Sequence, residues 1–236
     1  MKDIIAMDLF CGCGGFSLGL IQGGINVVLG LDFSYDALAT YLYNLAADDY
    51  KYVDLMPDEK WRQKYMKNTH HFYGKKENLW PPQPRHDKRY GWMRTVKAVV
   101  HADITKIHGE DLLRYAGVDH VDLIAGSPPC QSFSSARAGG QLKYDPRDEL
   151  SFEMARIINE IGPENYIMEN VPYFAKKRLP DGRLIMDVFN QIAALGYWKK
   201  FDGCDLANNL YDLYYGIPKP TFEIRTPCRW TGDTVI

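Results

Sequence analysis

The sequence predicts an α/β fold with a mainly parallel sheet and helices on both faces. Short apolar runs alternate with amphipathic stretches of helical length along most of the chain, which is typical of strands joined by crossover helices. The first unit shows this most clearly. The run IIAMDLF (4–10) is followed by a glycine-rich turn, a helical stretch from about Ser17 to Gly23 and a second run, VVLGLD (27–32). The beginning of the chain is therefore predicted to be a βαβ unit.

The rest of the chain repeats this alternation. Ser34 is a suitable N-cap for a helix after the second run. Four further strands are predicted at AVVHAD (98–103), VDLIAG (121–126), NYIMEN (165–170) and YWKKFDGCDL (197–206). Three further helices are predicted at GEDLLRYAG (109–117), ELSFEMARIINEIG (149–162) and RLIMDVFNQIAALG (183–196).

Length and composition indicate one globular domain, residues 1–236, which is long enough to bury a sizeable core and to form a catalytic domain. Hydrophobic residues make up 46% of the chain and charged residues 25%, and no apolar run approaches the roughly 20 residues of a membrane span. The first residues lack the pattern of a signal peptide. The five cysteines have no paired spacing, which favours reduced thiols. We therefore expect a cytoplasmic protein without a membrane segment.

A basic segment breaks the alternation between residues 48 and 97, and we predict an inserted subdomain or arm there. From Lys51 to His101 there are 12 Lys and Arg against 5 Asp and Glu, which gives this segment a formal charge of +7. The rest of the chain has a formal charge of −9, and the whole chain has a net charge of −2. Eight aromatic residues lie in the same stretch. Basic and aromatic side chains together can bind phosphates and stack on bases, although a solvated polar excursion explains the composition equally well.

Glycines and acidic residues follow the predicted strands at the edge where open α/β sheets bind ligands. Gly12, Gly14 and Gly15 allow a tight turn and a close approach of the backbone to a ligand. Asp32 ends the second strand, where an acidic residue binds ribose hydroxyls, and Asp103 follows the third, where it could accept from an adenine amino group. Together they predict a pocket for an adenosine-containing ligand. A generic glycine turn and a dinucleotide ligand remain alternatives, whereas a P-loop would need a lysine after the glycines.

Cys130 lies in GSPPCQSFS (126–134), directly after two prolines that end the predicted strand. Prolines cannot donate to a β-ladder, so the thiol is predicted to lie on a stiff loop beyond the sheet. Either a packed thiol or a nucleophile fits this position. Glu169, in MENVP (168–172), ends the next strand at the same edge and could share a proton with a substrate ring nitrogen. Cys11 and Cys13 have no second Cys or His pair nearby, so no metal site is expected.

The motifs DLFCGCGGFSLG, LDFSYDAL, ADI, GSPPCQSFS, DPRDEL, MENV and YYGIPK occur in this order. They resemble the cytosine-5 DNA methyltransferase family over most of the chain outside the basic segment. The resemblance implies a Rossmann-like S-adenosylmethionine-dependent methyltransferase fold. It also implies transfer of a methyl group from S-adenosylmethionine to C5 of cytosine, in DNA whose target base is flipped out of the duplex. Cys130 would add to C6 of the cytosine and Glu169 would hold or protonate N3.

The resemblance also implies the roles of further residues. Those expected to contact the cofactor are Phe10, Gly12, Gly14, Gly15, Asp32, Asp103, Ile104, Pro128 and Leu150. Those expected to hold the substrate or the catalytic loop are Arg147, Gln131, Asn170 and Arg225.

Several departures from the family pattern leave alternatives open. YYGIPKPTFEIR lacks the usual Gln-x-Arg-x-Arg, so that Lys219 and a displaced Arg225 are the cations expected there. The usual target-recognition domain and final motifs do not follow. The basic segment could replace that domain, or a second polypeptide could supply it. A methyltransferase acting on RNA or on a free cytidine nucleotide, and a non-catalytic nucleic-acid-binding subunit, are the other hypotheses. Retention of both Cys130 and Glu169 favours an enzyme.

Overall fold

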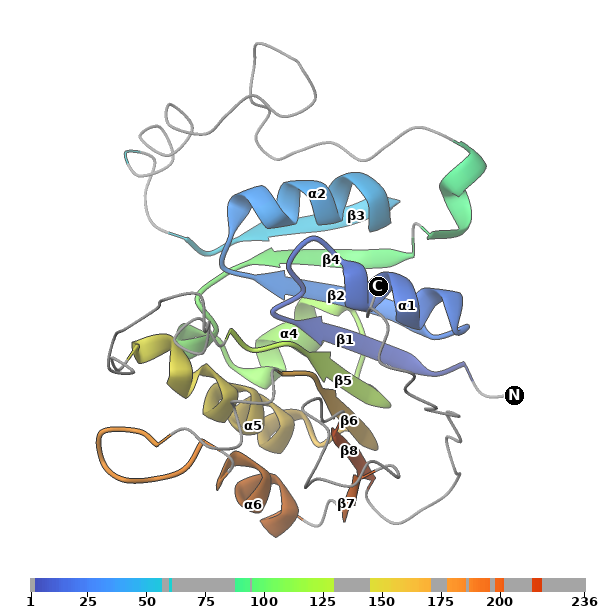
Figure 1. The fold of residues 1–236 in the computed structure, drawn as a ribbon. Coiled ribbons are helices and arrows are strands. Elements are labelled where there is room, and N and C mark those ends of the chain that lie inside the picture. The colour runs from blue at the N-terminus through green and yellow to red at the C-terminus, as the bar shows by residue number, and fades with distance from the viewer. Residues whose placement is uncertain are drawn as a thin grey trace, which may run out of the picture.

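A computed structural model describes most of the predicted elements. The described residues are 3–56, 60, 88–93, 95–129, 145–170, 178–185, 187–195, 198–201 and 214–217. Their strands form one eight-stranded sheet in the order β3-β4-β2-β1-β5-β6-β8-β7 (Figure 1). The strands are β1 (Ile5–Leu9), β2 (Asn26–Asp32), β3 (Ala46–Asp54), β4 (Val96–His101), β5 (Leu123–Gly126), β6 (Asn165–Met168), β7 (Trp198–Phe201) and β8 (Tyr214–Ile217).

Pairing within the sheet is parallel from β3 to β6, whereas β8 runs antiparallel to both β6 and β7. The parallel strands therefore end at one common edge of the sheet. That edge carries the loops after β1, β2, β4, β5 and β6, where ligands of open α/β sheets bind. The predicted α/β class with a mainly parallel sheet is confirmed.

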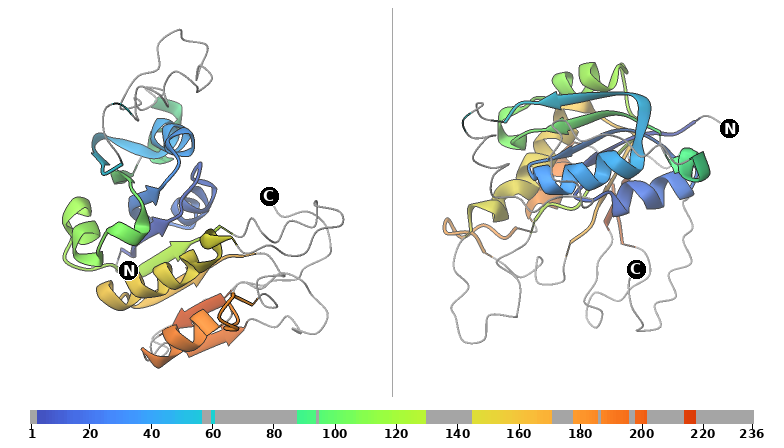
Figure 2. Two further views of the ribbon diagram at one scale, coloured as in Figure 1. Left: turned by 90° about the vertical axis from the view of Figure 1, so that its left-hand side faces the viewer. Right: turned by 90° about the horizontal axis from the view of Figure 1, so that it is seen from above.

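Helices cover both faces of the sheet, as the views in Figures 1 and 2 show. The helices are α1 (Gly15–Gln22), α2 (Tyr35–Leu45), α4 (Gly109–Ala116), α5 (Leu150–Ile161) and α6 (Asp187–Ala194). Side chains of β1 alternate between the two faces, as the period of a strand requires. Ala6 packs in the core with α1 and α2, whereas Met7 and Leu9 pack in the core with α4, α5 and α6. Burial on both faces explains why the central strands are apolar almost throughout.

Local sequence signals determine several helix ends. The Ser34 side chain accepts from the Ala37 amide at the start of α2, which confirms the predicted N-cap. Helices α4 and α5 end at Gly117 and Gly162, whose φ angles of 71° and 66° favour glycine. Within the described residues, none of the helices combines the length and apolar character that a membrane crossing requires.

Two strands differ from the sequence prediction. Residues 48–54, which we assigned to the inserted segment, belong to β3, an edge strand that pairs with β4. Its exposed residues include two aspartates, so the apolar pattern that identifies central strands is missing. The segment YYGI forms β8, although we interpreted it as a motif and assigned no strand there. Most of the remaining basic segment lies outside the described residues, so the inserted subdomain stays a prediction.

Candidate active site

The glycine-rich loop joins β1 to α1 at the carboxyl edge of the sheet. Phe10, Gly12 and Gly14 have φ angles of 58°, 52° and 95°. The loop is closed by hydrogen bonds from the Cys11 amide to Leu31 O (3.0 Å) and from the Gly14 amide to Cys11 O (2.9 Å). A left-handed φ at Phe10 is rare for a bulky residue and is typical of functional loops. The tight turn predicted from the glycines is thus present.

Two glycines of this loop face open space. A Cβ added at Gly12 or Gly15 would find no heavy atom within 4 Å other than its chain neighbours, among the residues described. At Gly14, by contrast, a Cβ would lie 2.5 Å from Leu45 Cδ1. Gly14 is therefore required by packing against α2, whereas Gly12 and Gly15 leave room in which a ligand can approach the backbone. This open cradle fits the expected cofactor.

Asp32, at the end of β2, links the glycine loop to the start of α2. Its Oδ2 accepts from the Gly12 amide at 2.9 Å and its Oδ1 from the Ser34 amide at 2.7 Å. Each carboxylate oxygen has a second lone pair, and the residue is only partly buried. Asp32 can therefore still accept from ligand hydroxyl groups, in agreement with a ribose-binding role.

A buried polar chain supports the glycine loop from the sheet side. Asp8 Oδ2 accepts from the Ser17 amide (3.1 Å) and the Ser17 hydroxyl (2.6 Å), and the Ser17 hydroxyl lies 2.8 Å from the Tyr41 hydroxyl. Asp8 and Tyr41 are fully buried. Burial raises the pKa of Asp8 to about 7, against the lowering effect of the Ser17 hydrogen bonds. We did not predict this series of hydrogen bonds, because Asp8 lies in an apolar run and its partners come from two helices.

Asp103 follows β4 and caps the short 3-10 helix η3 (Ile104–Lys106). Its Oδ1 accepts from the Thr105 amide (3.1 Å) and hydroxyl (2.8 Å), and its Oδ2 lies 3.5 Å from Lys106 Nζ. Partial burial by itself raises the pKa of Asp103, but the bonds from Thr105 and Lys106 outweigh it, so the pKa is below the ordinary value. Asp103 is held as a carboxylate at the edge of the sheet beside β2. Ile104 is buried, with 4% of its surface exposed.

The ends of β5 and β6 are joined to each other and to β1. The Ser127 amide donates to Leu9 O (3.3 Å) and the Glu169 amide to Gly126 O (3.1 Å). The side-chain amide of Asn170, which is buried, donates to Pro128 O at 3.0 Å. Asn170 therefore fixes the backbone two residues before Cys130. Glu169 is exposed at the same edge, while Cys130, Gln131 and Arg225 lie outside the described residues.

Arg147 and Leu150 lie where the chain enters α5. Arg147 donates to Asp145, with Nε 2.9 Å from Oδ1 and Nη2 2.5 Å from Oδ2. This ion pair raises the pKa of Arg147. About half of the Arg147 side chain remains exposed, and Leu150 is partly buried against the main core. The roles expected for the two residues at the ligand stay predictions.

Phe33 is a candidate site residue that we did not predict from the sequence. It follows Asp32 directly and is 60% exposed at the carboxyl edge of the sheet. Its carbonyl lies 3.1 Å from Nε2 of His101, which is fully buried and whose Nδ1 lies 3.3 Å from Asp54 Oδ1. An exposed aromatic ring next to Asp32, the carboxylate predicted to bind ribose, offers a stacking surface for a base. The signal was available in the letters LDF, where an aromatic residue follows the strand-end acid.

The predicted site residues divide into those that lie at the common edge and those outside the described part of the chain. The glycine loop and Asp32 are in direct contact, and Asp103 follows the strand next to β2. Pro128 and Asn170 are in direct contact across β5 and β6. Among the described residues, there is no cluster of three or more His, Cys, Asp or Glu arranged to hold a metal ion.

Comparisons with known proteins identify the family of the chain. The chain matches the family of C-5 cytosine-specific DNA methylases over residues 4–72 and 88–211. It is 30% identical over 177 residues to a protein of Methanocaldococcus jannaschii named as the type II methyltransferase M.MjaORF1200P, covering 70% of this chain and 48% of that protein. It is 25% identical over 214 residues to the type II methyltransferase M1.HphI of Haemophilus parahaemolyticus, covering 90% of this chain and 42% of the relative.

A solved structure supports the fold. A protein described as a DNA modification methyltransferase, encoded within a prophage of E. coli, superposes with a TM-score of 0.55 at 20% identity, covering 91% of this chain and 47% of that one. The chain thus spans less than half the length of these proteins. Fold and site together define an α/β protein of the Rossmann-like methyltransferase type, with its ligand edge at the ends of the parallel strands. Within that class, the chain belongs to the C-5 cytosine-specific DNA methylase family.

Proposed function

We propose that this chain carries the catalytic centre of a DNA cytosine-5 methyltransferase that uses S-adenosylmethionine. The observation that carries the proposal is the arrangement at the sheet edge. The open glycine cradle bonded to Asp32 lies beside the joined ends of β5 and β6, from which the loop to Cys130 departs. S-Adenosylmethionine would supply an electrophilic methyl group. The cradle, Asp32, Asp103 and the exposed ring of Phe33 supply the groups that would bind it.

The chain's own residues account for the rest of the chemistry. The Cys130 thiolate would form a bond to C6 of cytosine while Glu169 holds a proton at N3, and this addition makes C5 nucleophilic. After C5 has gained the methyl group, a base takes the C5 proton, the electron pair re-forms the C5–C6 double bond and the thiolate leaves. Asn170 would act on this step indirectly, because it binds Pro128 O, two residues before Cys130 in the chain.

Methyl transfer from tritiated S-adenosylmethionine tests the proposal. We expect label in duplex DNA, and none in RNA or free cytidine nucleotides. The Cys130→Ala and Glu169→Gln variants are expected to lose at least about 100-fold in rate. DNA with 5-fluorocytosine should form a covalent adduct with the wild type and none with Cys130→Ala, because fluorine cannot leave as the proton does. Label in RNA or nucleotides alone would contradict the proposed substrate, and full activity of Cys130→Ala would contradict the mechanism.

We further propose that the basic segment contributes to DNA binding. The excess of positive charge between Lys51 and His101 supports this, since phosphate contacts dominate affinity for DNA. Neutralising four lysines or arginines between residues 60 and 89 should weaken binding and flatten its dependence on salt. Unchanged binding would leave recognition to a second polypeptide, which is the competing hypothesis.

A further inference from the structure

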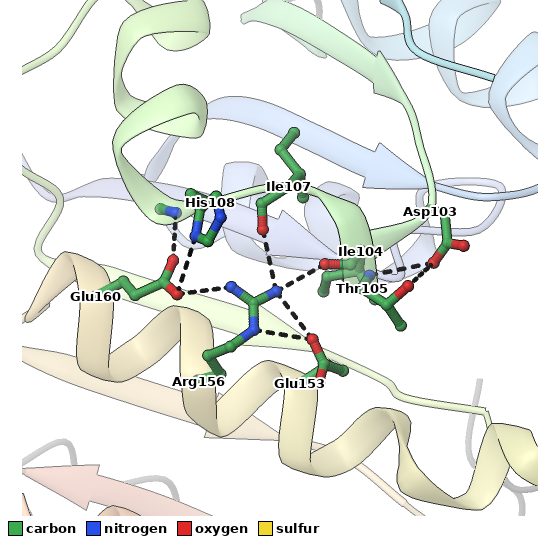
Figure 3. A network of polar contacts seen from close by, with 9 residues as sticks. Asp103, Ile104, Thr105, Ile107, His108, Glu153, Arg156 and Glu160 are labelled. Carbon is green, nitrogen blue, oxygen red and sulfur yellow. Dashed lines mark hydrogen bonds and ion pairs between the residues drawn. The ribbon is translucent and has the colours of Figure 1, made fainter.

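Arg156 of α5 binds the segment that follows β4 (Figure 3). Its Nη2 donates to the backbone carbonyls of Ile104 at 2.8 Å and Ile107 at 3.0 Å. Both carbonyls belong to the segment after β4, which contains the 3-10 helix η3. One guanidinium nitrogen of α5 therefore holds both ends of that short turn.

These two carbonyls need a partner from outside the turn. A three-residue helix cannot satisfy its own terminal carbonyl groups, and the bond within it that reaches Ile104 O, from the Ile107 amide, is 3.5 Å long. Ile104 and Ile107 are almost fully buried, with 4% and 1% of their surfaces exposed. Buried carbonyls without a donor are costly, so Arg156 contributes directly to the shape of the turn.

Two glutamates of α5 hold the guanidinium in place. Glu153 Oε2 accepts from Nε at 2.9 Å, and Glu160 Oε1 accepts from Nη1 at 2.7 Å. The other oxygen of Glu160 accepts from the Gly109 amide at 2.6 Å, at the first residue of α4. Burial by itself would lower the pKa of Arg156, but the two carboxylates outweigh it and raise the pKa. The planar fork is thus fixed by ion pairs on either side of the carbonyls that it binds.

We propose that Arg156 is a positioning residue for recognition of the adenine ring. Asp103 and Ile104 open the turn that Arg156 holds, and under the proposed function these two residues form the adenine side of the cofactor site. The inference rests on that function only in requiring an adenosine-containing ligand. Arg156 would act without touching the ligand, because its donors are directed to the backbone and to the two glutamates (Figure 3).

The consequence is a role in base discrimination. The Asp103 carboxylate can accept from the 6-amino group of adenine but not from the 6-keto oxygen of hypoxanthine. The protein should therefore bind S-adenosylhomocysteine more tightly than S-inosylhomocysteine, in which a keto oxygen replaces the 6-amino group and N1 carries a hydrogen. If Arg156 fixes Asp103 and Ile104, its loss should remove much of this preference, whereas a general loss of stability would weaken both ligands equally.

Isothermal titration of the 236-residue chain with both ligands tests this role. We expect the wild type to prefer the adenosyl ligand about tenfold. Arg156→Gln should weaken the adenosyl ligand about tenfold, or about 1.4 kcal/mol, and leave the inosyl ligand nearly unchanged. Arg156→Lys should give an intermediate effect, because an ammonium lacks the planar fork. Arg114→Gln is the matched control, since Arg114 lies exposed on α4 and pairs with Asp111 of the same helix.

The outcomes separate this inference from the proposed reaction. The positioning role would be overturned if the folded Arg156→Gln variant kept the wild-type preference for the adenosyl ligand. It would also be overturned if the variant lost the same affinity for both ligands. If Arg156→Gln does not fold, Glu153→Gln decides, because it removes one ion pair that orients the guanidinium and should loosen its bonds to the two carbonyls, with a loss of preference of about two- to threefold expected. Failure of the wild type to bind either ligand would overturn both proposals. Adenine preference that depends on Arg156, without DNA methylation, would overturn the proposed reaction alone.

Discussion

Two walls of the candidate site, on either side of the β2 end, are stabilised in different ways. The glycine loop after β1 is held by buried packing and by the chain from Asp8 through Ser17 to Tyr41. The turn after β4 is held by Arg156, whose side chain and carboxylate partners are about one quarter exposed. The first wall therefore depends on shape and on a buried acid whose pKa is raised by burial, and the second on ionised groups near solvent. The two should differ in their response to substitution, to pH and to salt.

Gly30→Ala should give the largest effect and act on the first wall. A Cβ at Gly30 would lie 2.4 Å from Tyr41 Cζ and 2.5 Å from its hydroxyl. Tyr41 is fully buried and cannot move aside freely, so we expect a loss of about 3 kcal/mol in the free energy of unfolding. Urea denaturation measures this loss.

Gly19→Ala is the matched control for this substitution. Gly19 lies exposed on α1, and its Cβ would meet no described heavy atom within 4 Å apart from its chain neighbours and the backbone of its own helix, so we expect an unchanged or slightly higher stability. In a Tyr41→Ala background, Gly30→Ala should lower the free energy of unfolding by less than it does in the wild type, since the obstructing ring is removed. Equal losses in the two glycine variants would contradict close packing at Tyr41.

Asp8→Asn tests the buried acid of the first wall. The pKa of Asp8 is about 7 in the folded protein, above the ordinary value of 3.8. The folded state therefore binds the proton more tightly, and the stability that this contributes is present below about pH 4 and lost as pH rises through 7. We expect the wild type to lose about 2 kcal/mol between about pH 5 and 8 through this group. Asp8→Asn, which does not titrate, should show a flatter profile in urea denaturation. An unchanged slope would show that another group carries the pH dependence.

Sequence patterns predicted those parts of the two walls whose structure depends on residues nearby in the sequence. Strand periodicity and turn composition located the glycine loop, Asp32 and Asp103 at one edge, because each depends on neighbours within a few residues. Arg156 lay within a correctly predicted helix but carried no signal of its role, since the carbonyls that it binds are 52 and 49 residues away in the chain. The sequence likewise carried no sign that Gly30 must be a glycine, because the side chain of Tyr41 on the next helix leaves no room for a Cβ there. Contacts between distant segments, rather than local propensity, decide both positions.

Glu160→Gln acts on the second wall and should give the smallest effect, with the opposite dependence on pH. Partial burial by itself raises the pKa of Glu160, but the bonds from the Gly109 amide, Arg156 and His108 outweigh it and the pKa lies below the ordinary value of 4.5. The stability that Glu160 contributes is therefore present above pH 4.5 and lost as pH falls through the lowered pKa.

The size of this last effect follows from exposure. About one quarter of the Glu160 side chain is accessible to solvent, and the pair is screened by water and salt, so we expect a loss of about 1 kcal/mol or less at about pH 7. The difference between Glu160→Gln and the wild type should shrink at about pH 3 and in about 1 M salt. Glu110→Gln, at an exposed position in the first turn of α4, is the control. A difference that persists unchanged in acid would show that packing, rather than charge, holds the second wall, and the contrast between the two walls would then not hold.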